Sequence, residues 1–256
     1  MAHALGVERD ALWRLAPATP LSETVWRRSR KLLHRRLSGE PLAYLVGRKD
    51  FWTLRLAVRP GTLVPRPETE ALVAFAERLF DPGTRARLLD LGTGGGALAL
   101  ALASLYPAAD VWATDRTEEA LALAAENARR NARRLILRRG DWFTALPPGS
   151  RFALIVANPP YIAEDDPALR GDGLRREPKS ALLAGEGGLA DLRTIVRESP
   201  RHLVPGGWLL LEHAPGQETC LAALFHAGGF VSTEAIRDPG GILVGTAARL
   251  PPNPNF

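Results

Sequence analysis

The sequence of 256 residues contains a single cysteine, Cys220, and no long apolar run. One cysteine excludes a disulfide framework and a cysteine-based metal cluster. No run reaches the roughly 18 apolar residues that a membrane-spanning helix needs. The five histidines are not paired at a spacing that suits metal ligands, and the first ten residues lack the basic-then-apolar order of a signal peptide. We therefore expect a cytoplasmic protein with no metal and no membrane partner.

Positive charge is in excess, because 33 lysines and arginines stand against 28 aspartates and glutamates, for a net charge of +5. Nearly all of the positive charge is arginine. Such an excess indicates either a general compositional preference or a partner that carries phosphates or acidic patches. The first interpretation is favoured, because the arginines are scattered and no segment alternates basic with aromatic residues.

The N-terminal part of the sequence predicts a small helical domain and a linker. A helical apolar period runs through 25–37 and ends at a serine, a glycine and a proline. Residues 1–48 are therefore expected to form a helical domain for substrate recognition. Residues 49–68 are expected to form a β-hairpin linker, with one strand over 51–58 and a returning strand at 62–64.

The rest of the chain, 69–256, alternates short apolar strands with helices, which is typical of an α/β fold with a doubly wound, mostly parallel sheet. The run at 152–157 is apolar on both faces, as expected for a central strand covered by helices on both sides. We therefore expect a Rossmann-like catalytic domain. The predicted strands lie at 87–91, 110–115, 134–139, 152–157, 208–212, 231–236 and 242–247.

A glycine-rich loop follows the first of these strands. Glycines let a bound nucleotide approach the backbone closely. The spacing is Gly-x-Gly-x-Gly and not the Gly-x-Gly-x-x-Gly of phosphate-binding loops, and Asp90 stands where it would repel a phosphate. A carboxylate there suits a ligand with an ammonium or sulfonium group, while a purely structural turn is the alternative. The candidate cofactor-binding residues of this segment are Asp90, Gly92, Thr93, Gly94, Gly95 and Gly96.

Two more carboxylates follow neighbouring strands. Asp115 ends the second strand, at the position where a carboxylate binds a ligand ribose; capping of the next helix is the alternative. Asp141 and Trp142 follow the third strand and suit the amino group and the ring of adenine, with core packing of the aromatic residue as the alternative. Together with Asp90, these carboxylates predict a cationic, ribose-bearing ligand without phosphate, which is S-adenosylmethionine.

The most specific motif is Asn158-Pro159-Pro160-Tyr161, directly after the buried fourth strand. Two prolines stiffen the loop and leave carbonyl oxygens without competing N–H donors. The Asn158 side-chain oxygen and the Pro159 carbonyl can each accept a hydrogen bond from one planar NH₂ group, and the Tyr161 ring can pack on it. We expect these four residues to be catalytic and Asn158 to contact the cofactor as well. The pattern predicts methyl transfer to an amide or amine nitrogen.

The chain resembles the PrmC/HemK family, whose members methylate a glutamine of peptide chain release factors. The Asn-Pro-Pro-Tyr motif is shared with adenine and guanine amino-methyltransferases, so the segment 65–70 is the discriminating one. The resemblance covers nearly the whole chain and rests on Pro65-Arg66-Pro67-Glu68-Thr69-Glu70, the loop from Asp90 to Gly96, Asp141-Trp142-Phe143, Asn158-Pro159-Pro160-Tyr161, Glu177-Pro178, Glu212 and Gln217.

The resemblance implies a class I methyltransferase fold, with a mostly parallel seven-stranded sheet behind a small helical domain that recognises the release factor. It implies an S-adenosylmethionine-dependent protein-(glutamine-N5) methyltransferase that modifies the glutamine of the Gly-Gly-Gln loop, on a substrate that is free or associated with the ribosome. By this resemblance, Asn158 and the carbonyl of Pro159 hold the substrate amide, with Tyr161 beside it.

Two other classes of function fit part of the sequence. A nucleic-acid exocyclic-amine methyltransferase would share the Asn-Pro-Pro-Tyr motif and the basic charge, but residues 1–48 make only a small base-recognition domain. A non-catalytic binding protein on a methyltransferase scaffold is disfavoured by the intact glycine loop and the intact Asn-Pro-Pro-Tyr motif.

Overall fold

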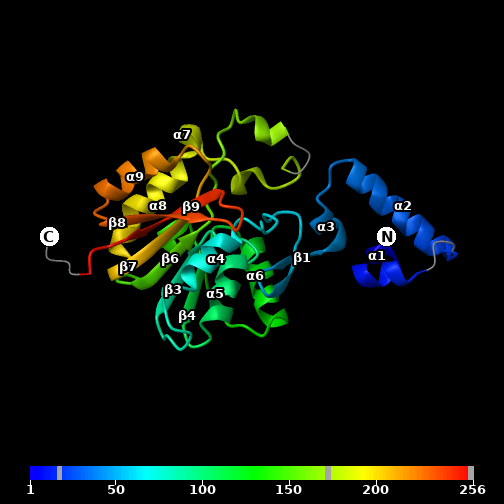
Figure 1. Cartoon of the computed structure of the whole chain (residues 1–256), viewed down its shortest axis with the longest axis horizontal. Helices are drawn as coiled ribbons and strands as arrows, with labels where there is room; N and C mark the ends of the chain where they lie inside the picture. The colour runs from blue at the N-terminus through cyan, green and yellow to red at the C-terminus, as the bar shows by residue number, and fades with distance from the viewer. Residues whose placement is uncertain (16–18, 171–173, 253–256) are drawn as a thin grey trace.

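The computed structural model describes residues 1–15, 19–170 and 174–252. Its N-terminal helices lie at one end of the molecule, beside a larger α/β unit (Figure 1). The longest of them, α2, begins after Ser22, whose hydroxyl accepts a hydrogen bond from the Val25 N–H. No residue of α2 is buried. The elements of this part are α1 (Ala2–Leu5), the 3₁₀ helix η1 (Arg9–Arg14), α2 (Glu23–Leu37) and α3 (Leu42–Val46).

A short antiparallel hairpin follows, formed by β1 (Arg48–Phe51) and β2 (Leu54–Ala57). The expectation of one strand over 51–58 and a returning strand at 62–64 is wrong. The chain reverses earlier, at Trp52, which has a φ of 54° and donates its backbone N–H to the Glu70 carboxylate at 2.9 Å. In a continuous strand the Trp52 N–H would pair with a neighbouring strand, but here the Glu70 carboxylate accepts it.

The main sheet has seven strands among the described residues, in the order β5-β4-β3-β6-β7-β9-β8. All neighbouring pairs are parallel except those of β9, which runs antiparallel to both β7 and β8. The prediction of a mostly parallel seven-stranded sheet is confirmed. The strands are β3 (Arg87–Leu91), β4 (Asp110–Asp115), β5 (Ile136–Arg139), β6 (Phe152–Ala157), β7 (Leu203–Glu212), β8 (Ser232–Arg237) and β9 (Leu243–Arg249).

Helices cover both faces of this sheet (Figure 1). Successive strand residues point to opposite faces, so Leu88 packs into the core beneath α4 and α5, whereas Leu89 packs into the core beneath α8 and α9. The remaining elements are the helices α4 (Glu70–Ala76), α5 (Ala97–Leu105), α6 (Glu118–Arg130), α7 (Gly185–Gly188), α8 (Ala190–Glu198) and α9 (Glu218–Ala227), and the 3₁₀ helices η2 (Trp142–Ala145), η3 (Pro167–Arg170), η4 (Lys179–Ala181) and η5 (Ser199–Arg201).

None of the helices in the described ranges is both long enough and apolar enough to cross a membrane.

Candidate active site

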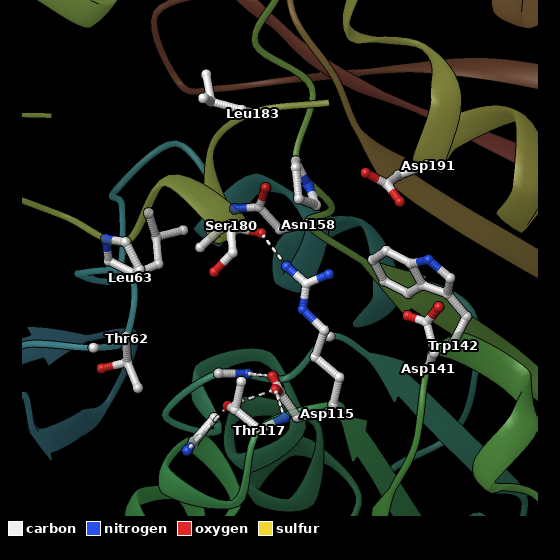
Figure 2. Close-up of a pocket in the computed structure, with 18 of the residues that line it drawn as sticks. Thr62, Leu63, Asp115, Thr117, Asp141, Trp142, Asn158, Ser180, Leu183 and Asp191 are labelled. Atoms are coloured by element: carbon white, nitrogen blue, oxygen red, sulfur yellow. Dashed lines mark hydrogen bonds between the residues drawn. The ribbon is translucent and has the colours of Figure 1, made fainter. Parts of the chain in front are cut away.

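The carboxyl ends of β3, β4 and β6 meet where the strand order reverses, and a cavity opens there (Figure 2). This switch point is the usual ligand position in an open parallel sheet. Predicted cofactor residues that line the cavity are Gly92, Gly94, Asp115, Asp141, Trp142 and Asn158. A second, adjoining cavity is lined by Asp90, Thr93 and Gly95, again with Gly92, Gly94 and Asn158. Gly96 instead is the N-cap residue of α5 and lies against Ala124.

Asp90 is almost completely buried and organises the glycine loop from below. Its Oδ2 accepts hydrogen bonds from the Thr93 hydroxyl at 2.6 Å and from the Ala99 backbone N–H at 3.0 Å. Burial raises the pKa of Asp90 to about 7, although these two hydrogen bonds act in the opposite direction. The carboxylate therefore ties the loop to the first turn of α5, a structural contact that the sequence did not indicate.

Asp115 connects the glycine loop with the start of α6. Its Oδ2 accepts the Gly94 backbone N–H at 2.9 Å, and its Oδ1 accepts both the backbone N–H and the hydroxyl of Thr117 at 2.9 Å. Thr117 is the N-cap residue of α6. The carboxylate thus supports the helix start and lines the cavity at the same time, so the two interpretations of Asp115 do not exclude each other.

Trp142 lines the cavity, while the next residue, Phe143, is buried and stacks on His202 with ring centroids 4.7 Å apart. Burial raises the pKa of Asp191, and the neighbouring Trp142 side chain acts to lower it. Figure 2 shows Asp191, Trp142 and Asp141 at one side of the cavity, away from Thr62 and Leu63. Sequence reasoning missed Asp191, because a lone aspartate at the start of α8 matches no motif.

Asn158 follows β6 and is held by residues from two distant segments. Its Nδ2 donates to the Thr69 hydroxyl oxygen at 3.0 Å, and the Thr69 hydroxyl donates to Glu212 Oε2 at 2.6 Å. The Tyr161 hydroxyl donates to Glu212 Oε1 at 3.0 Å. Thr69 and Glu212 stand in segments that carry the family resemblance, but sequence reasoning assigned no role to either residue. The structure places both against the Asn-Pro-Pro-Tyr motif.

A third cavity lies on the other side of Asn158. Pro159, Tyr161 and Glu212 line it, and Asn158 and Leu63 line all three cavities. Its wall includes Arg66, which pairs with the buried Glu177. Asn158 therefore stands at the junction between the cavity of the cofactor motifs and the cavity of Tyr161.

The end of the motif is held by Gln217. Its Nε2 donates to the backbone oxygen of Tyr161 at 3.1 Å, and its Oε1 accepts the Ala214 N–H at 2.9 Å. His213, the histidine beside Glu212, is bonded to the Ala214 backbone oxygen and to Thr246. Within the ranges that the structure describes, no group of three His, Cys, Asp or Glu side chains is placed to hold a metal ion.

A sheet of this order, with a glycine loop after β3 and Asn-Pro-Pro-Tyr after β6, defines the class of Rossmann-like methyltransferases. Residues 69–170 match the family model described as the methyltransferase small domain, and residues 1–47 match that of the PrmC N-terminal domain. The chain belongs to the family of release factor glutamine methyltransferases.

Curated relatives of this chain carry that name, among them proteins from Pseudomonas aeruginosa and Xylella fastidiosa. The one from Pseudomonas aeruginosa is 48% identical over 246 residues, which cover 94% of this chain and 87% of the relative. The one from Xylella fastidiosa is 44% identical over 237 residues, which cover 92% and 86%.

Solved structures share the fold at low sequence identity. A methyltransferase from Pyrococcus furiosus superposes with a TM-score of 0.60 at 21% identity, over 88% of this chain and 98% of that one. A 16S rRNA methyltransferase from T. thermophilus, in complex with S-adenosylmethionine and guanosine, superposes with a TM-score of 0.58 at 21% identity, over 79% of this chain and 49% of that one.

Proposed function

We propose that this protein transfers a methyl group from S-adenosylmethionine to the side-chain amide nitrogen of the glutamine in the Gly-Gly-Gln loop of peptide chain release factors. The observation that carries the proposal is the position of Asn158 at the junction of the cavities, with Asp115 and Trp142 on one side and Tyr161 on the other. The name of the curated relatives supports the choice of substrate.

The cofactor-side cavity fits S-adenosylmethionine by its chemistry. The carboxylates of Asp115, Asp141 and Asp191 line it beside one guanidinium, that of Arg116, so the lining is acidic on balance and suits a cation without phosphate. A Cβ atom at Gly92 would lie 3.0 Å from Trp142, so only glycine leaves the loop open beside the ring. Bound there, the cofactor supplies an electrophilic methyl group on a sulfonium. We assign Asp115 to the cofactor ribose and Asp141 and Trp142 to its adenine. The loop from Asp90 to Gly96 is assigned to the remaining part of the cofactor.

The substrate amide is held by the Asn158 side-chain oxygen and the Pro159 carbonyl, each of which accepts one N–H of the glutamine NH₂ group. Two acceptors fix the plane of the amide, so the nitrogen faces the methyl donor. An amide nitrogen is a poor nucleophile, and alignment supplies much of the rate. With the cofactor bound, the nitrogen would form the new N–C bond at the expense of the carbon–sulfur bond of the sulfonium and would release one of its two protons to solvent.

Residues 1–48 are assigned to recognition of the release factor, and the hairpin linker over 49–68 joins them to the catalytic domain over 69–256. Exposed side chains of α2 that can meet a protein partner include Trp26, Leu33 and Leu37, beside a series of arginines. A release factor substrate implies action in the cytoplasm, on the free factor or at the ribosome.

The test is transfer of labelled methyl from S-adenosylmethionine to a purified release factor, beside a version whose Gly-Gly-Gln glutamine is replaced by alanine. Label on the unaltered factor alone, lost with Asn158→Ala, is the expected result. Label on RNA or DNA in the same assay, with none on the release factor, would contradict the proposal and favour a nucleic-acid methyltransferase. Repeating the assay with ribosomes present tests whether they take part.

A further inference from the structure

We propose that Glu212, acting through Thr69, fixes which end of the Asn158 side-chain amide faces the substrate. Both are positioning residues, and the proposal rests on the proposed methylation of a glutamine amide. It is carried by a directed series of hydrogen bonds that joins β7, the segment before α4 and the loop after β6.

The orientation of Asn158 matters because its two ends have opposite properties. The oxygen accepts hydrogen bonds and the NH₂ group donates them, and a half-turn about the last bond exchanges the two in nearly the same volume. A substrate NH₂ group can be held only by the oxygen. If the Asn158 amide were turned, its NH₂ group would face the substrate NH₂ group, and both are donors. The substrate glutamine would then keep the Pro159 carbonyl as an acceptor and lose the Asn158 oxygen.

The hydrogen bonds select one orientation. An ionised carboxylate only accepts, so the single proton of the Thr69 hydroxyl must be donated to Glu212, at 2.6 Å. The Thr69 oxygen is then left to accept, and Asn158 Nδ2 donates to it at 3.0 Å. With the NH₂ group turned to Thr69, Oδ1 is the end of the Asn158 amide that is left to accept from the substrate, and Asn158 lines both the cofactor-side cavity and the cavity of Tyr161.

The carboxylate is fully engaged in this arrangement. Glu212 is 2% exposed, and its other oxygen accepts the Tyr161 hydroxyl at 3.0 Å. Thr69 is 4% exposed. A buried carboxylate with one donor on each oxygen has a fixed place, so Glu212 defines the direction of the whole series. Through Glu212 and Thr69, the Tyr161 hydroxyl at the end of the Asn-Pro-Pro-Tyr motif is linked to the Asn158 amide at its start.

The direction depends on the charge of Glu212. Burial raises the pKa of Glu212 to about 7; the hydrogen bonds from Thr69 and Tyr161 and the charge of Arg66 act to lower it, and the charge of Glu68 acts to raise it. A protonated Glu212 can donate to Thr69, which can then donate to Asn158 Oδ1, and the amide turns. Activity is therefore expected to fall as the pH drops through about 7.

The first test compares Thr69→Val with Thr69→Ser in the methyl-transfer assay on a release factor. Valine keeps the shape and removes the hydroxyl, so kcat is expected to fall about 10- to 100-fold. The dissociation constant for S-adenosylhomocysteine should stay close to that of the wild type, whereas the melting temperature should fall, because the buried Glu212 carboxylate loses one of its donors. Serine restores the hydroxyl and should restore most of the activity.

The second test uses the pH profile of kcat for Tyr161→Phe. This variant removes a donor that lowers the pKa of Glu212, so the acid limb of the profile should move to higher pH. Glu212→Gln should abolish that limb, because its amide does not titrate. A Thr69→Val enzyme as active as the wild type, or an acid limb that stays in place in both other variants, would overturn the proposal. A wild-type enzyme inert toward release factors would instead refute the proposed function, which keeps the two failures distinct.

Discussion

The Trp142 ring lies directly against the backbone of Gly92, such that a Cβ atom at position 92 would stand 3.0 Å from Trp142 Cζ3. Gly92 also has a φ of 67°, a conformation that side chains disfavour. The glycine is thus required twice, by its own backbone and by the aromatic ring that lines the cavity.

Gly92→Ala is expected to weaken binding of S-adenosylhomocysteine about 10-fold or more, because either Trp142 or the loop must shift. Isothermal titration measures the affinity. The control is Gly83→Ala, at a glycine that lines none of the three cavities. A Cβ atom there would meet nothing within 4 Å, and Gly83 is not among the glycines with positive φ, so the control should bind as the wild type does. Equal losses would contradict the assignment of Trp142.

The stability of the protein should depend on pH through Asp90. Burial raises the pKa of Asp90 from its ordinary 3.8 to about 7, so between these values the folded state binds a proton that the unfolded state has released. Asp90 therefore makes the free energy of unfolding fall as the pH rises through this window, by at most about 1.4 kcal/mol per pH unit.

Asp90→Asn isolates this contribution. The asparagine oxygen can still accept from Thr93 and Ala99, but the side chain does not ionise. Urea unfolding at a series of pH values should show that the free energy of unfolding of the variant rises relative to that of the wild type as the pH rises. The two values should be closest at acidic pH. A constant difference across the window would show that Asp90 does not titrate on folding.

The ion pair of Arg66 with Glu177 should contribute more to stability than an exposed pair. The Glu177 side chain is fully buried, its Oε2 accepts the Val64 backbone N–H at 2.9 Å, and Arg66 is 29% exposed. Arg66→Ala would leave a buried charge without its partner, so the free energy of unfolding is expected to fall by about 2 kcal/mol.

The control is Arg27→Ala, which removes an exposed pair with Glu23 whose side chains are 73% and 71% exposed. Its effect on the free energy of unfolding should be below about 0.5 kcal/mol. Chemical denaturation measures the free energy of unfolding of both variants. Similar losses in the two would show that burial of Glu177 does not make its ion pair more stabilising than an exposed one.

The sequence predicted the sheet and the main motifs because those signals are local. A buried strand, the glycine loop after it and the Asn-Pro-Pro-Tyr segment are each read within a few residues. The early reversal at Trp52 could not be read this way, because it depends on the Glu70 carboxylate 18 residues away. The partners of Asn158 were out of reach for the same reason: Thr69 is 89 residues away, and Glu212 lies 143 residues beyond Thr69.

Those separations have a consequence for how the site is assembled during synthesis. A nascent chain that has passed Tyr161 already carries the glycine loop and the complete Asn-Pro-Pro-Tyr motif, yet the residue that directs the Asn158 amide belongs to the end of β7. If Glu212 orients Asn158 as proposed, the direction of this amide is set only when the second half of the sheet folds onto the first. An incomplete chain can hold the glycine loop and the Asn-Pro-Pro-Tyr motif and still present the wrong end of Asn158.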